Sequence, residues 1–366
     1  MKKISGTFIT EFLLISALLV CTNIPLSAQK PFFNAIKNGD IKVVSSYISK
    51  GINSDAIYSE TIVDGISNKK YAYSFDPLEY AAWNNQIEVV KLLIANKEKI
   101  TGYQNSLNKA FSSSISNENP ELTRLFLDAG ADVNARCQIC YGRAAIHIAL
   151  EYANFALFNE LLKRGARLDV TDKMGRTLLH SVATNGNISI AGELLKANLD
   201  INAKDSTGST PVLYAAANGY LKLLKFFEEK GADLRETEND GSGILVQSVN
   251  GENDTLVSYL ISKNFEINVV NEDNWTPLLY ACHNNNLAIV KTLIKGGADV
   301  NIANNKGEEP LLWALWNKNS EMARIIIDAG ADLNVYDFRP IARKNIKDKS
   351  FLKYLDEKYK NGDSGS

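Results

Sequence analysis

The residues best suited to chemistry are Cys137, Cys140 and His147, which lie in the stretch "NARCQICYGRAAIHIAL" (Asn134–Leu150). Two thiolates with an imidazole can form half of a zinc site, and a closely spaced thiol pair can act in redox exchange. The same pair can also form a disulfide that closes the tip of a loop. The motif alone does not distinguish these possibilities, because a short motif acquires its meaning from the elements around it.

The elements around this motif repeat along the chain. From Gly165 onward a closing segment recurs every 33 residues, as from Gly297 to Gly330. A second marker keeps the same spacing, with "TLLHSVA" at Thr177, "TPVLYAA" at Thr210, "GILVQSV" at Gly243, "TPLLYAC" at Thr276 and "EPLLWAL" at Glu309. Two markers in phase indicate a repeat architecture.

One period is readable as a pair of helices and a turn. Thr276 can cap a first helix with its hydroxyl, and Pro277 suits the first helical position. The second helix, within "NLAIVKTLIKGG", stops where Gly297 can take a left-handed conformation. Its apolar residues lie at helical spacing and are Ile289, Val290, Leu293 and Ile294. Because one pair cannot bury its apolar face, the pairs are predicted to stack into a solenoid.

These markers resemble the ankyrin repeat, with its D-x-x-G-x-T-P-L-H opening, its two alanines and its GAD-x-N close. The resemblance covers roughly Pro31 to Lys360 and is specific at Asp172–Ala183, Asp205–Ala216 and Asn271–Cys282. It implies an all-α fold, an ankyrin-repeat solenoid of stacked helix-turn-helix units with protruding hairpin loops. We expect about ten units between residues 29 and 360, with an N-terminal cap at 31–53 and a C-terminal cap at 338–360. Residues 361–366 are expected to form a disordered tail.

The first 28 residues have the layout of a signal peptide. Lys2 and Lys3 precede the apolar run Phe12–Cys21, which is too short to span a membrane, and small residues end at Ala28. We therefore expect an exported protein, periplasmic or secreted, of bacterial origin. Membrane attachment is expected only if this segment is retained or if Cys21 is lipidated, as in a bacterial lipoprotein.

An insertion interrupts the early repeats at residues 54–75. The distance from Asn53 to Glu79, which occupies the histidine position of its repeat, exceeds the regular spacing by about fifteen residues. Such a loop often carries function. The insertion contains Tyr58, Tyr71 and Tyr73, and both a contact surface and an extra hairpin that caps the N-terminal end remain open.

The register also bears on the cysteines. His147 and His180 occupy the position at which the family uses imidazole to brace the turn. Cys137 and Cys140 then supply only two ligands, whereas structural zinc requires four. In an exported protein we predict a Cys137–Cys140 disulfide and a buried, free Cys282, while inert thiols and redox or metal chemistry remain alternatives.

Composition and motifs exclude several classes of function. The chain of 366 residues has a formal charge of -2, which lacks the basic excess of nucleic-acid-binding proteins. It contains no phosphate-binding loop, no H-E-x-x-H and no G-x-S-x-G motif. We therefore expect no enzyme activity, no cofactor, no metal and no nucleic-acid partner.

The class of function that remains is protein binding. We expect the chain to be a monomer that binds a protein partner. The resemblance implies a concave face lined by hairpin tips and first helices, and aromatic residues at its variable positions are favoured binding hot spots. Sealing of the seams between repeats is the alternative role for these rings. The further alternatives are an inhibitor or immunity protein that occludes a toxin or enzyme, and a thiol-disulfide redox protein. The predicted partner-binding residues are Trp83, Tyr152, Trp275, Tyr280, His283, Trp313 and Trp316.

Overall fold

The computed structural model describes residues 26–50, 57–63, 70–100, 102–116, 119–137 and 141–362. The chain divides after Ala145 into two compact units, and each is described by itself. Residues 1–25, with most of the predicted signal peptide and Cys21, lie outside the described residues, as do 363–366. A cut after Ala28 would fall inside the first helix. None of the helices described here has both the length and the apolar character needed to cross a bilayer.

The first unit consists of helix pairs and two short antiparallel strand pairs. Its helices are α1 (Leu26–Lys37), α2 (Ile41–Ser49), α3 (Pro77–Trp83), α4 (Ile87–Ala95), α5 (Tyr103–Ser116) and α6 (Pro120–Asp128), with a 3-10 turn, η1 (Lys97–Lys99). Its strands are β1 (Tyr58–Val63), β2 (Lys70–Phe75), β3 (Arg136–Cys137) and β4 (Arg143–Ala144).

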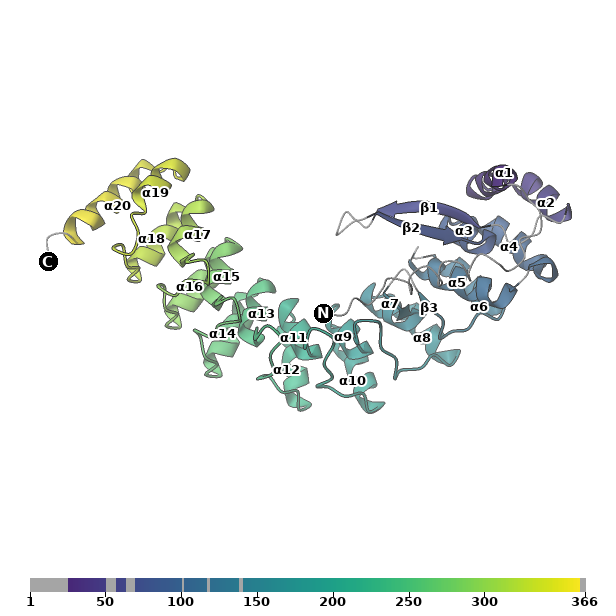
Figure 1. The fold of residues 1–366 in the computed structure, drawn as a ribbon. Coiled ribbons are helices and arrows are strands. Elements are labelled where there is room, and N and C mark those ends of the chain that lie inside the picture. Colours follow the sequence, from purple (N-terminus) through teal and green to yellow (C-terminus); the bar gives the residue numbers. More distant parts are fainter. Residues whose placement is uncertain are drawn as a thin grey trace, which may run out of the picture. The chain divides into compact units, whose positions relative to one another are not determined.

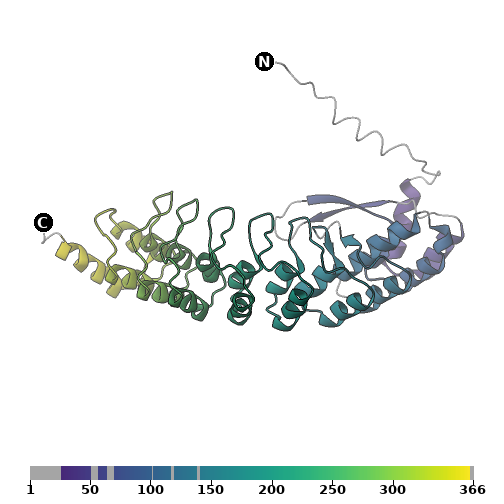
Figure 2. The same cartoon turned by 90° about the horizontal axis from the view of Figure 1, so that it is seen from below.

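The second unit is the regular part of the solenoid. The helices lie in consecutive pairs, and from α9 to α19 each first helix packs against the first helix of the next pair (Figure 1). Hairpin loops project on the same side of successive pairs (Figure 2). The helices are α7 (Ala145–Glu151, beginning at the unit boundary), α8 (Phe155–Lys163), α9 (Leu178–Ala183), α10 (Ile188–Lys196), α11 (Pro211–Ala217), α12 (Leu221–Glu229), α13 (Ile244–Asn250), α14 (Asp254–Ser262), α15 (Pro277–His283), α16 (Leu287–Lys295), α17 (Pro310–Trp316), α18 (Ser320–Asp328), α19 (Arg339–Asn345) and α20 (Lys349–Gly362).

Local sequence explains where the helices begin and end. The hydroxyl of Thr276 accepts a hydrogen bond from the N–H of Leu279 at 3.1 Å, and Pro277 is the first residue of α15, both as predicted. Gly297, with φ 94°, takes the predicted left-handed conformation after α16. Most second helices of the second unit begin after an asparagine whose side chain caps the helix, namely Asn154, Asn187, Asn253, Asn286 and Asn319.

The core follows the predicted periodicity. Ile289, Val290 and Leu293 of α16 are buried, and Ile294 is half-buried. Cys282 of α15 is a free cysteine with no exposed surface, and burial raises the pKa of its thiol, so it stays protonated and acts as a small apolar residue. The all-α ankyrin-type solenoid expected from the sequence is confirmed.

Neighbouring repeats are joined by asparagine side chains that reach back one repeat. The amide of Asn185 donates to the carbonyl of Leu150 at 2.6 Å. The amide of Asn317 donates to the carbonyl of Cys282 at 2.8 Å. The two carbonyls lie at the C-terminal ends of the preceding first helices, and each also accepts from a backbone N–H of its own repeat, that of Ala153 or Asn285.

The described part of the insertion forms an antiparallel pair, with Tyr58 opposite Phe75 in β1 and β2. The ring of Tyr58 stacks on Phe33 at 5.1 Å and lies 5.0 Å from Tyr80. The hydroxyl of Tyr73 donates to Glu79 at 2.6 Å. The strands therefore pack on the first helices. Residues 54–56 and 64–69 and the side chain of Tyr71 lie outside the described set.

The C-terminal end is covered by α19 and α20. Arg343 and Asp356 form an ion pair at 2.7 Å between these helices. The hydroxyl of Tyr359 donates to the carbonyl of Tyr336 at 3.1 Å and accepts from the N–H of Phe338 at 2.9 Å. The helix α20 continues through Gly362, two residues past the predicted cap.

Candidate binding surface

Four hairpin tips of the second unit, which we call fingertips, are each built around one polar side chain, namely Asp172, Asp205, Asn271 or Asn304. At Asp205, one carboxylate oxygen accepts from the N–H groups of Thr207 at 2.8 Å and Ser209 at 3.1 Å. The other oxygen accepts from the hydroxyl of Tyr214 at 2.9 Å. Burial opposes ionisation of Asp205, but these hydrogen bonds outweigh it and hold the pKa of the carboxyl below its usual value.

Asn271 organises the corresponding fingertip two repeats later. Its carbonyl oxygen accepts from the N–H groups of Asp273 at 3.1 Å and Trp275 at 2.9 Å. Its amide donates to the hydroxyl of Tyr280 at 3.1 Å. The backbone of Trp275 is thus fixed by the same kind of turn that Asp205 forms, so the fingertip presents its indole in a defined place.

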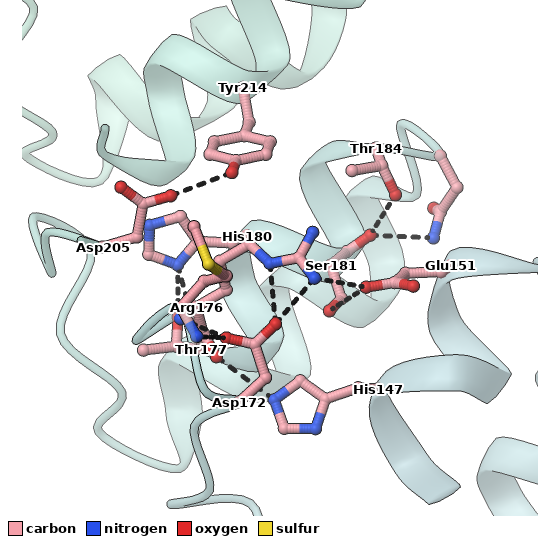
Figure 3. Close-up of polar contacts among 12 residues, drawn as sticks. His147, Glu151, Asp172, Arg176, Thr177, His180, Ser181, Thr184, Asp205 and Tyr214 are labelled. Carbon is pink, nitrogen blue, oxygen red and sulfur yellow. Dashed lines mark hydrogen bonds and ion pairs between the residues drawn. The ribbon is translucent and has the colours of Figure 1, made fainter. Parts of the chain in front are cut away.

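His147 and His180, at the histidine position of their repeats, brace these turns (Figure 3). Nδ1 of His180 accepts from the N–H of Thr177 at 3.0 Å, so Nε2 carries the proton and donates to the carbonyl of Ser209 at 3.0 Å. Burial lowers the pKa of His180, which favours the neutral ring. His147 places Nε2 3.2 Å from the carbonyl of Arg176. The predicted bracing role of both histidines is confirmed.

Arg176 connects a fingertip to the end of α7. Its Nε lies 2.8 Å from a carboxylate oxygen of Asp172, and its outer nitrogen lies 3.9 Å from Glu151 (Figure 3). The hydroxyl of Ser181 donates to Glu151 at 3.4 Å. In this part of the structure the charged and polar groups contact one another across the repeat, and their arrangement serves the framework.

Five aromatic side chains meet on two adjacent repeats. The indole of Trp275 lies 4.9 Å from Tyr280, 5.5 Å from His283 and 5.6 Å from Trp313, measured between ring centroids. The rings of His283 and Trp313 meet edge to face at 4.6 Å. Trp313 meets Trp316 in the same way at 5.1 Å. We call these five residues the aromatic cluster.

The repeat geometry explains why they meet. Tyr280 and His283 lie three residues apart on α15, and Trp313 and Trp316 lie three apart on α17, so each pair shares a helix face. The two helices pack against each other (Figure 1). Trp275 reaches the cluster from the fingertip that precedes α15. Five of the seven predicted partner-binding residues therefore lie together.

The cluster is partly buried and partly exposed. Trp275, Tyr280 and Trp313 are half-buried, whereas His283 is exposed and Trp316 has 40% of its surface exposed. The indole N–H of Trp313 is covered and has no hydrogen-bond partner among the described residues, an uncommon state for a buried donor. The inner rings seal the seam between repeats, and the outer rings present apolar surface to the solvent.

The other predicted residues lie elsewhere. Trp83, at the end of α3 in the first unit, packs on Phe75 of the hairpin at 5.6 Å. Tyr152, just after α7, is 54% exposed and outside the cluster. Cys137 is disulfide-bonded, but Cys140 lies outside the described residues, so the Cys137–Cys140 pairing stays a prediction. The described residues hold no group of three or more metal-ligating side chains.

Comparison with a protein-family model agrees with this architecture. A family model described as ankyrin repeats (3 copies) matches residues 78–172, 146–238 and 244–337. The chain belongs to the ankyrin-repeat family. It is also similar to a solved ankyrin repeat domain from Acinetobacter baumannii AYE, with 33% identity over 51% of this chain and 98% of that domain and a TM-score of 0.42. No curated protein matches the chain. Ankyrin repeats are generally protein–protein interaction modules, and their fold is typically not enzymatic.

Reasoning from the sequence missed the acidic character of the fingertips beside the cluster. Asp240, Glu272 and Asp273 are all exposed there. The signal was present in "ETENDGS" (236–242) and "NEDNW" (271–275), which contain five carboxylates and neither lysine nor arginine. The sequence alone does not place these carboxylates beside the aromatic rings.

Proposed function

We propose that this protein acts by binding a protein partner through the aromatic cluster. The observation that carries the proposal is the continuous array of rings across two repeats, which ends in exposed His283 and Trp316. Large rings lose little conformational entropy on binding and remove much apolar surface from water, so they often dominate interface energies. The braced fingertips hold this surface in place before the partner arrives, which lowers the cost of association.

The test uses the residues of the cluster that contribute least to the seam. We would compare the chain from Gln29 with its His283→Ala, Trp316→Ala double variant in a pull-down from the native envelope fraction. The captured partner would then be purified for binding measurements. We expect at least about a tenfold loss of affinity, since removing a hot-spot residue costs about 2 kcal/mol.

A matched control comes from the same protein. Tyr152 is exposed just after the first helix of another repeat, so Tyr152→Ala removes an exposed ring outside the cluster. If the captured partner bound the wild-type protein and the double variant with equal affinity, and both proteins gave the same circular dichroism melt, the proposal would be refuted. Loss of binding in the Tyr152→Ala variant alone would move the contact surface to that repeat.

We also propose that the protein is exported and works in the periplasm or outside the cell. Support comes from the charged start, the short apolar run and the small residues that end at Ala28. A fusion of residues 1–40 to alkaline phosphatase, which folds only outside the reducing cytoplasm, should be active, and a Leu14→Arg variant should not. Activity in neither fusion would contradict export.

An inhibitor or immunity role is a narrower form of the same proposal. It requires that the captured partner be an enzyme or toxin. Activity of the purified partner, measured with and without the wild-type chain, separates occlusion from simple tethering.

A further inference from the structure

We propose that the partner segment bound at the aromatic cluster is basic and lays an arginine side chain on the exposed rings. This inference rests on the proposed function, because it specifies the chemistry of the partner at the same surface. It is carried by the charge of the fingertips that border the cluster and by the nature of the exposed rings.

The charge beside the cluster is strongly negative. The three fingertips at residues 236–242, 270–275 and 304–309 contain seven carboxylates and one lysine, Lys306, although the whole chain has a formal charge of only -2. Within this set Glu236 is already paired with Lys204 at 2.6 Å. The lysine that borders the cluster on the helix side is Lys318, which is exposed. The patch therefore keeps a net negative charge after both lysines are counted.

The carboxylates nearest the rings face the solvent. Glu272 and Asp273 form the turn with their backbones: the N–H of Glu272 donates to the carbonyl of Asp240 at 2.8 Å, and the carbonyl of Asp273 accepts from Asn305 at 3.0 Å. Both residues are exposed, and they lie three and two positions before Trp275. A ligand on the ring of Trp275 would therefore meet two carboxylates at its edge.

The negative charge of these fingertips helps to raise the pKa values of two neighbouring groups. The pKa of Tyr280 is raised, first by burial and then by the negative charges of Asp240 and Asp273. The pKa of Glu238 is raised by burial and by the charges of Asp240 and Asp205, although its hydrogen bonds oppose the shift. Anionic partners such as phosphorylated peptides or nucleic acids are repelled by such a field.

Arginine fits both halves of this surface. Its guanidinium is planar, stacks on the face of an indole and pairs with carboxylates through two parallel hydrogen bonds. Lysine carries the same charge but is more strongly hydrated and has no planar group to stack. Trp316 and His283 supply the exposed rings, and Glu272 and Asp273 supply the carboxylates. A partner with arginine next to apolar residues would satisfy both.

The experiment titrates the chain from Gln29 with three peptides that differ only in one residue type. They are Gly-Arg-Gly-Arg-Gly-Arg-Gly, its lysine counterpart and its citrulline counterpart, which keeps the shape of arginine but not its charge. Three of the four tryptophans lie in the cluster, so intrinsic fluorescence reports the contact. We expect the arginine peptide to bind at least about tenfold more tightly than the citrulline peptide and about threefold more tightly than the lysine peptide.

Variants locate the contact. The Asp240→Asn, Glu272→Gln, Asp273→Asn variant and the His283→Ala, Trp316→Ala variant should each lose at least about fivefold in affinity for the arginine peptide. A matched control neutralises three exposed acids on the second helices and the turns after them, with Glu229→Gln, Asp254→Asn and Glu266→Gln. It makes the same change in net charge and should bind as the wild type does.

The outcomes separate this inference from the function on which it rests. Equal binding of the three peptides, or equal losses in the acidic variant and its charge control, would overturn the arginine assignment. The proposed function would still stand if a partner were captured and lost with the double aromatic variant. Conversely, selective arginine binding without any captured partner would support the chemistry of the surface and contradict the proposed function.

Discussion

Asp205 should contribute more to stability than most fingertip residues, since it organises both the turn and the tyrosine behind it. Replacing Asp205 with alanine removes the acceptor for the N–H of Ser209, which is 3% exposed, and for the hydroxyl of Tyr214. The N–H of Thr207 also loses its acceptor, but Thr207 is exposed, so water can replace the carboxylate there. The N–H of Ser209 is covered and Tyr214 is half-buried, and both donors lose this acceptor.

The expected loss follows from this count. A buried donor without a partner costs about 1–3 kcal/mol, so Asp205→Ala should lower the free energy of unfolding by about 3 kcal/mol. Asp205→Asn should cost only about 1 kcal/mol. The asparagine keeps one carbonyl oxygen for the turn, and its amide can donate to Tyr214 as the amide of Asn271 donates to Tyr280.

The pH dependence gives a second signature. Because the pKa of Asp205 is lower in the folded protein than the usual value of 3.8 for an aspartate, the ionised carboxyl stabilises the fold above that pH. This contribution is lost as the pH falls through the folded pKa. The advantage of the wild type over Asp205→Asn should therefore shrink in acid, whereas the Asn variant keeps the same hydrogen bonds at both pH values.

Urea unfolding followed by circular dichroism measures these differences at pH 7 and in acid. Ser206→Ala, an exposed change at the same fingertip, is the control and should stay within about 0.5 kcal/mol of the wild type. The reasoning fails if Asp205→Ala unfolds within about 1 kcal/mol of the wild type, or if Asp205→Asn is as unstable as the alanine variant.

Three further predictions concern other parts of the chain. Glu79 is 1% exposed and burial raises its pKa to about 7 from 4.5, so the free energy of unfolding should fall by about 3 kcal/mol as the pH rises from 4.5 to above 7, because the unfolded chain loses this proton first. Urea unfolding at pH 5 and 8 measures this fall, and Glu79→Gln should abolish it. The denatured, unreduced mature chain should show one free thiol, that of Cys282, in a thiol titration, whereas three would exclude the predicted disulfide. Gly251→Ala would bring its Cβ into collision with the carbonyl oxygen of Ala216 and should lower the free energy of unfolding by at least about 2 kcal/mol. Gly307→Ala, at φ 75° with open space around it, should cost about 1 kcal/mol; a larger loss there than at Gly251 would contradict the steric argument.

The sequence predicted the regular repeats well because their signals are local. The cap at Thr276, the left-handed Gly297 and the buried face of α16 all follow from residues within one period. Part of the aromatic cluster was also predictable, since Tyr280 and Trp313, like His283 and Trp316, are 33 residues apart and equal positions in adjacent repeats must become neighbours.

Features outside the period were not predictable in the same way. The contact between Tyr73 and Glu79 depends on the path of the inserted hairpin, which has no counterpart in the other repeats. The pairing of Asp205 with Tyr214 and of Asn271 with Tyr280 needed the conformation of the turn, although both pairs are nine residues apart. The acidic surface required knowing which charges lie beside the rings.

The asparagine bonds between repeats have a consequence for how such a chain can change in evolution. Each amide, such as those of Asn185 and Asn317, reaches one unit back and no further. Duplication of one complete 33-residue unit that carries such an asparagine would repeat the donor and its acceptor at the new junction, whereas a change of a few residues within a helix would misalign both. The length of the array, and with it the area offered to a partner, can therefore vary in whole steps without redesign of the junctions.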